Sequence, residues 1–127
     1  MASIAFPDIS KKATLSDGAI YGYARVLGNC DKPTLLFLHG FPSAAYDWRH
    51  QIDYFSKQGY GLLVPDLLGY GDTSKPKDLK AYTMASIGKQ VAELLDCENL
   101  TRVIAVAHDW YAASEPMLLF LQADAAD

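Results

Sequence analysis

The chain has 127 residues, a length that suits one domain, since domains usually hold roughly 100–150 residues. Half of its residues are hydrophobic and 20% are charged, which excludes a disordered tail. Eleven lysines and arginines against fifteen acidic residues give a net charge of −4, so we expect no nucleic-acid partner. Cys30 and Cys97 form no C-x-x-C motif and have no histidine at zinc-ligand spacing, so we expect no metal site.

Two observations bear on localisation. No apolar run approaches the roughly 18–20 residues that a membrane-spanning helix needs. Near the N-terminus, Pro7 and Asp8 interrupt the apolar core that a secretory signal requires. The sequence therefore predicts a cytoplasmic protein without a membrane partner.

The apolar pattern changes its period along the chain, which predicts alternating strands and helices. An antiparallel hairpin, turned at Asp17-Gly18, is predicted over residues 13–17 and 20–27. Continuous apolar runs predict strands buried on both faces at residues 34–38, 62–64 and 103–107. Helical spacing predicts helices over residues 44–58, from Thr83 onward and from Trp110 onward.

This order of elements indicates an α/β fold, with an N-terminal hairpin followed by parallel strands that carry helices on both faces. In such sheets the chemistry lies in the loops that follow the carboxyl ends of the strands. The three loops in that position begin at His39, Asp66 and His108.

The loop after the third parallel strand has the sequence HDW and is expected to lead into a helix. Asp109 would lie at the N-terminus of that helix, where the dipole and the free N–H groups favour an anion. Two interpretations are open: Asp109 caps the helix, or it is a nucleophile on a tight strand–turn–helix elbow. An aspartate is already ionised at pH 7, because its ordinary pKa is about 3.9, so it needs no base for a first attack.

The loop after the first parallel strand has the sequence His39-Gly40-Phe41-Pro42. The glycine allows a ligand to approach the backbone, and the proline fixes the next dihedral angle. We interpret His39 as a hydrogen-bonded structural histidine. The backbone N–H groups of Phe41 and Trp110 could form the two-donor oxyanion hole of acyl-transfer chemistry.

Three stretches resemble the α/β-hydrolase superfamily, and within it the epoxide hydrolase-like branch: FLHGFPSAAYDWRHQI, GYGLLVPDLLGYGDTSKP and VIAVAHDW. They occur in the family's order and at about its spacing, and the likeness covers residues from about 13 to 110. The resemblance implies that Asp109 is the nucleophile and that Phe41 and Trp110 supply the oxyanion hole. It also implies structural roles in the loop motif for His39, Gly40 and Pro42.

Within the family that the sequence resembles, the side chain at the elbow selects the chemistry, and serine there would suggest an esterase or a lipase. By this resemblance Asp109 implies attack on an epoxide carbon, which gives a covalent ester and then a diol, or displacement of a halide from carbon. The substrate is then a small epoxide or a related electrophile. A haloalkane dehalogenase is the alternative, because the indole of Trp110 could hold a halide. That branch usually carries asparagine in place of Phe41, so the epoxide is favoured.

The segment from Gly69 to Ser74 invites comparison with a dinucleotide-binding loop. It lacks the third glycine, and Pro76 follows where the helix should begin, so no nucleotide cofactor is predicted. The same residues resemble the family's GYG loop, which packs near the active site.

In the family, the catalytic acid and the water-activating histidine follow the elbow, and a helical cap supplies tyrosines that protonate the epoxide oxygen. This chain ends 18 residues after Asp109 (127 − 109), and the resemblance gives that histidine's role to none of His39, His50 and His108. We therefore expect residues 1–127 to be a single domain, a partial α/β-hydrolase core without the cap and the C-terminal half. The interpretation is an enzyme cut short or mis-spliced near residue 110, with little turnover of its own.

Two other classes of protein remain open. The chain could be a non-catalytic binding domain, or it could complete a hydrolase by association with a second chain. In the fold that the sequence resembles, strand 103–107 has neighbours on both sides, and the later neighbours are missing here. We therefore expect self-association through the exposed edge of that strand.

Overall fold

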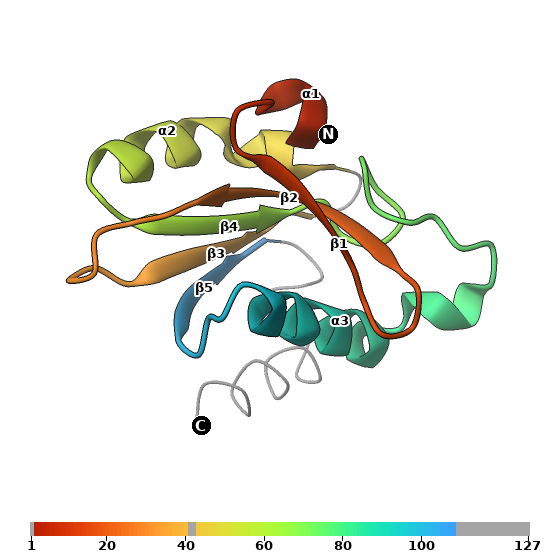
Figure 1. The fold of residues 1–127 in the computed structure, drawn as a ribbon. Coiled ribbons are helices and arrows are strands. Elements are labelled where there is room, and N and C mark those ends of the chain that lie inside the picture. The colour runs from red at the N-terminus through yellow and green to blue at the C-terminus, as the bar shows by residue number, and fades with distance from the viewer. Residues whose placement is uncertain (1, 41–42, 109–127) are drawn as a thin grey trace.

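The computed structural model describes residues 2–40 and 43–108 (Figure 1). Within these residues, five strands form one sheet in the order β1-β2-β4-β3-β5. β2 is antiparallel to both β1 and β4, whereas β3 runs parallel to β4 and β5. The predicted α/β class, with a hairpin followed by parallel strands, is confirmed. The strands are β1 (Ser10–Thr14), β2 (Ile20–Val26), β3 (Thr34–Leu38), β4 (Gly61–Pro65) and β5 (Val103–Ala107).

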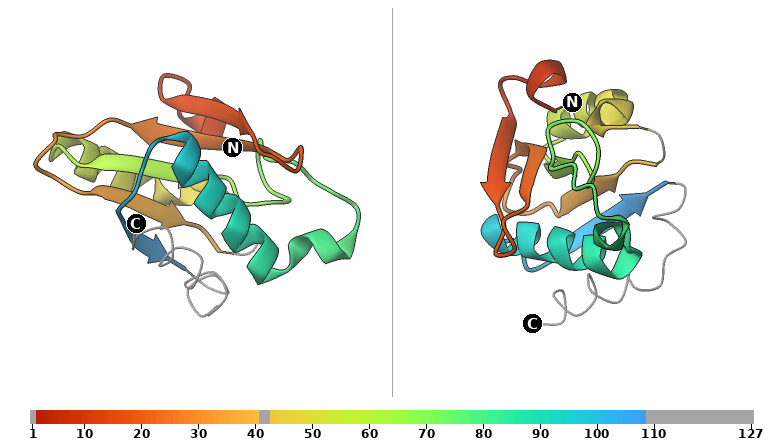
Figure 2. Two further views of the ribbon diagram at one scale, coloured as in Figure 1. Left: turned by 60° about the horizontal axis from the view of Figure 1, so that its bottom comes forward. Right: turned by 90° about the vertical axis from the view of Figure 1, so that its right-hand side faces the viewer.

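Helices cover both faces of this sheet, as predicted. Helix α2 (Arg49–Lys57), preceded by the 3-10 helix η1 (Ala45–Trp48), packs on one face, and α3 (Met84–Cys97) packs on the other (Figure 2). The two four-residue helices α1 (Ala2–Ala5) and η2 (Leu79–Tyr82) were not predicted. Among the described residues, none of the helices has both the length and the apolar character needed to cross a membrane.

An apolar layer lies on each face of the sheet, because successive side chains of a strand point to opposite faces. The layer between α2 and the sheet includes Ala24, Leu35, Phe37, Ile52, Leu62 and Val64. The layer between α3 and the sheet includes Tyr21, Tyr23, Leu36, Leu38, Leu63, Ile87, Val91, Leu94 and Leu95. Because β3 and β4 contribute side chains to both layers, they are buried on both faces, as their continuous apolar runs predicted. Full burial of one such aliphatic side chain contributes roughly 1.5–3 kcal/mol to the free energy of folding.

The hairpin is confirmed, but its first strand was predicted three residues too far along the chain. β1 begins at Ser10 rather than at residue 13, and Thr14 pairs with Ile20 across the turn. The Leu15 N–H donates to the Ala19 carbonyl at 2.8 Å, and Gly18 takes a φ of +88° that a side chain would disfavour. An edge strand needs no apolar alternation, which is why its lysine-rich sequence did not reveal the start.

β5 has the predicted bounds but not the predicted burial. Ile104 is 52% exposed and Val106 is 37% exposed. Their register opposite Leu35 and Phe37 of β3 places both side chains on the face that α2 covers elsewhere. In the described part of the chain β5 pairs with β3 alone, so it is the outer strand of the sheet.

Glu98, the residue after α3, joins that helix to the β1–β2 hairpin. Its carboxylate accepts hydrogen bonds from the Tyr23 hydroxyl at 2.5 Å, Arg25 Nε at 2.9 Å and Lys11 Nζ at 3.1 Å. The side chains of Arg25 and Glu98 are only 8% and 9% exposed. Burial opposes the ionisation of Glu98, but the three hydrogen bonds outweigh it and hold the pKa of this carboxyl below its usual value of 4.5.

Glu98→Gln is expected to lower the free energy of unfolding by about 3 kcal/mol, because it leaves the Arg25 guanidinium buried without its counter-charge. Urea denaturation at pH 7 measures the change. Since the folded-state pKa of Glu98 is lowered, its contribution is present above pH 4.5 and is lost as the pH falls further, so variant and wild type should converge in acid.

The matched control for this prediction is Asp53→Asn. Asp53 pairs with Lys57 at 3.1 Å, but the two side chains are 67% and 72% exposed. Removing an exposed pair one helical turn apart should change stability by less than about 0.5 kcal/mol. Similar losses in the two variants would contradict the role given to burial of Glu98.

Candidate active site

The loops that follow the carboxyl ends of β3, β4 and β5 meet at one edge of the sheet, as predicted for parallel strands. The loop after β3 begins at His39, and the loop after β4 begins at Asp66. His108 follows β5, and its backbone N–H donates to the Leu38 carbonyl at 3.1 Å. This bond extends the pairing of β3 and β5 by one residue, up to the point at which the chain enters the HDW motif.

His39 is fully buried, and both of its ring nitrogens are engaged. Nε2 accepts the Leu67 N–H at 2.9 Å, so Nδ1 carries the proton and donates it to the Gly40 carbonyl at 2.9 Å. Burial lowers the pKa of His39, which favours the neutral ring that this arrangement requires. The ring of Tyr70, from the GYG loop, lies edge-on to the His39 ring, with the two ring centroids 5.2 Å apart. His39 therefore ties the loop after β3 to the loop after β4.

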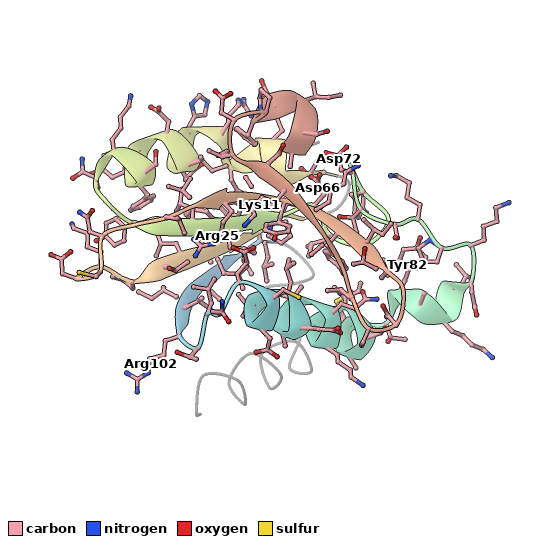
Figure 3. All side chains as sticks on the ribbon, viewed as in Figure 1. Lys11, Arg25, Asp66, Asp72, Tyr82 and Arg102 are labelled. Atoms are coloured by element: carbon pink, nitrogen blue, oxygen red, sulfur yellow. The ribbon has the colours of Figure 1, made fainter. Side chains whose placement is uncertain are left out.

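Asp66 is a functional candidate that sequence reasoning missed. The side chain is fully buried, and its Oδ1 accepts the Ala45 N–H at 2.9 Å. Oδ2 accepts the N–H groups of Ala2 at 3.0 Å and Asp72 at 3.1 Å. Asp66 and Asp72 lie close together below α1 (Figure 3). An aspartate directly after a buried strand was the available signal, but the donors at Ala2, Ala45 and Asp72 come from three different segments.

The GYG loop is shaped around this carboxylate. Gly71 has a φ of +52°, and a β-carbon at this position would collide with the Asp66 carboxyl group. The Thr73 hydroxyl donates to the Asp66 backbone carbonyl. The oxygen of the same hydroxyl accepts the Gly22 N–H at 3.0 Å. Glycine at position 71 is thus required by the conformation of the loop and by the proximity of the Asp66 carboxyl group.

A pocket of about 240 Å³ opens at this edge of the sheet. The described residues that line it are His39, Gly40, Asp47, Trp48, Gln51 and His108. The Trp48 ring stacks on Phe37 of β3 with the ring centroids 4.9 Å apart, which fixes one wall. The pocket thus brings together residues from both predicted motif loops. Four predicted site residues lie outside the described residues: Phe41, Pro42, Asp109 and Trp110.

A protein-family model described as the alpha/beta hydrolase fold matches residues 33–110. The chain therefore belongs to the α/β-hydrolase family. Its likeness within that family is to the epoxide hydrolase branch, which confirms the resemblance noted in the sequence. "Epoxide hydrolase 2" of Siraitia grosvenorii is 40% identical over 99 residues, which are 78% of this chain and 31% of that relative. "Epoxide hydrolase A" of Mycobacterium tuberculosis is 40% identical over 85 residues, 67% of this chain and 26% of the relative.

Solved structures agree with this assignment. A crystal structure of an epoxide hydrolase from Vigna radiata matches with a TM-score of 0.75 and 37% identity, covering 84% of this chain and 32% of that one. A second Vigna radiata epoxide hydrolase structure gives a TM-score of 0.80 at 35% identity, covering 96% of this chain and 36% of that one. The chain thus spans roughly a quarter to a third of the length of these relatives.

Proposed function

We propose that this chain carries the nucleophile and the oxyanion-hole loop of an epoxide hydrolase-like active site. The observation that carries the proposal is that the two motif loops follow paired parallel strands and border one pocket. Leu38 and Ala107 are register partners at the ends of β3 and β5, and Gly40 and His108 line the pocket beyond them. The proposed nucleophile Asp109 is the next residue after His108.

The first proposed step is alkylation of Asp109. A carboxylate oxygen forms a bond to an epoxide carbon, the carbon–oxygen bond of the ring breaks, and the released alkoxide takes a proton from water. All atoms of the epoxide remain on the protein as a hydroxyalkyl ester. In the second step water adds to the ester carbonyl, the backbone N–H groups of Phe41 and Trp110 stabilise the oxyanion, and a diol is released.

The second step needs a base to activate water. His39 does not fill that role, because one of its ring nitrogens accepts a backbone hydrogen bond and the other donates one. We propose that this chain, which spans a third or less of the curated relatives reported above, forms the ester and hydrolyses it slowly. The proposed partner is a small epoxide. The relatives and solved structures named above are themselves called epoxide hydrolases, which favours an epoxide over an alkyl halide.

The test is incubation of the chain with a strained aryl epoxide and, separately, with the corresponding alkyl bromide, followed by intact-mass measurement. The expected result is a stable gain of one whole epoxide mass, with a slower reaction for the bromide. Faster capture of the bromide, with loss of its halide, would favour dehalogenase chemistry instead. Capture of neither reagent would count against the proposed nucleophile.

A further inference from the structure

We propose that Asp66 is a positioning residue, whose buried carboxylate anchors Ala45 at the end of the loop that carries the proposed oxyanion-hole donor. The catalytic part of this inference rests on the proposed function, whereas the part that concerns the loop stands without it. The evidence lies in where the two ends of the loop are attached.

Both ends of the loop are bonded to one dipeptide. At the first end, the His39 ring accepts the Leu67 N–H, and at the last end the Ala45 N–H donates to Asp66 Oδ1. Asp66 and Leu67 are consecutive residues, and both are fully buried. The two ends of the segment between residues 39 and 45, which includes Phe41 in the sequence, are therefore attached to the same buried dipeptide.

This dipeptide is itself held from two further directions. Asp66 Oδ2 accepts the Ala2 N–H from α1 and the Asp72 N–H from the GYG loop. A carboxylate can accept on both oxygens at once, and bonds from N–H donors to a charged acceptor are about twice as strong as neutral ones. One side chain thus fixes segments that lie 64, 21 and 6 residues away in the sequence.

This arrangement predicts a selective effect for Asp66→Asn. Asparagine offers one carbonyl oxygen where aspartate offers two, so its NH2 group must face some of the N–H donors that the carboxylate serves. We expect the oxygen to keep the Ala2 and Asp72 donors, so that the NH2 group opposes the Ala45 N–H. The bond to the loop is then lost, while the contacts to α1 and the GYG loop remain.

The first measurement is hydrogen exchange of the peptide that covers residues 39–48, below the melting temperature of every variant. In Asp66→Asn we expect this peptide to exchange at least about tenfold faster than in the wild type. The matched control is Asp72→Asn, in the same loop, whose carboxylate accepts the Ser3 N–H at 2.7 Å and not the β3–η1 loop. In Asp72→Asn the exchange rate of this peptide should stay within about twofold of the wild-type rate. An unchanged peptide in Asp66→Asn, or an equal change in the control, would overturn the proposal.

The second measurement is the decay of the ester at Asp109, followed by intact mass after the excess epoxide is removed. The oxyanion-hole donors act in this hydrolytic step, and a displaced catalytic group costs on the order of a hundredfold in rate. Ester hydrolysis in Asp66→Asn should therefore be about 10- to 100-fold slower than in the wild type, while ester formation stays within about twofold. Unchanged hydrolysis together with slower ester formation would overturn the positioning role.

The two arms separate the two proposals. If the wild-type chain forms no ester, the proposed function fails while hydrogen exchange still decides the role of Asp66. If the wild-type chain forms the ester and Asp66→Asn matches it in both arms, the inference on Asp66 fails alone. Should Asp66→Asn not fold, the wild-type chain is tested for scalar coupling between the Ala45 amide nitrogen and the Asp66 carboxyl carbon. A detectable coupling supports the clamp, and its absence overturns it.

Discussion

Asp109→Asn is expected to abolish covalent capture of a strained epoxide by this chain. The carboxamide is a poor nucleophile, and loss of a nucleophile costs several orders of magnitude, so the rate should fall by more than about a thousandfold. Trypsin gives a convenient assignment, because Arg102 is the last lysine or arginine and the C-terminal peptide covers residues 103–127. The wild-type adduct should lie on this peptide, and fragmentation should place it on Asp109.

Asp47→Asn is the matched control for this experiment. The Asp47 carboxylate is exposed and lines the same pocket, so a reagent that simply labelled accessible acids would reach it as readily. We expect this variant to capture the epoxide at the wild-type rate, within about twofold. An adduct that persists in Asp109→Asn and disappears in Asp47→Asn would identify Asp47, and not Asp109, as the nucleophile.

The sequence predicted the parallel core well, for a physical reason. β3 and β5 have the bounds that their continuous apolar runs predicted, since such runs are typical of strands inside a parallel sheet. α3 begins after Thr83, whose hydroxyl accepts the Ser86 N–H at 3.1 Å, so its start was also visible in the sequence. Short elements such as α1 depend on what they pack against, and local patterns do not reveal them.

The candidate site was predictable in its location and less so in its parts. Parallel strands bring their following loops to one edge, so the meeting of His39 and His108 at one pocket follows from strand direction alone. Asp66 was missed because its role depends on donors at residues 2, 45 and 72, and no spacing rule relates those positions. The side chain looked like a loop aspartate, yet it is fully buried.

The chain is also expected to self-associate through the outer edge of β5. An edge strand presents unpaired N–H and C=O groups, and proteins normally protect such edges with lysine, proline or a bulge. β5 has the sequence VIAVA, with none of these residues, and it exposes Ile104 and Val106 on one face. A second copy that paired with β5 would satisfy the backbone groups and cover both side chains.

Ile104→Lys should therefore shift the chain toward the 13.9 kDa monomer, because a lysine on an exposed strand edge opposes pairing with another strand. Light scattering coupled to size exclusion at micromolar concentration gives the mass of each species. The control is Leu79→Lys in η2, where the side chain is 85% exposed and therefore more accessible than the 52% exposed Ile104. If general surface hydrophobicity caused association, Leu79→Lys would disperse the protein at least as well. Pairing through β5 requires that only Ile104→Lys does so, and a wild-type chain that is already monomeric would contradict it.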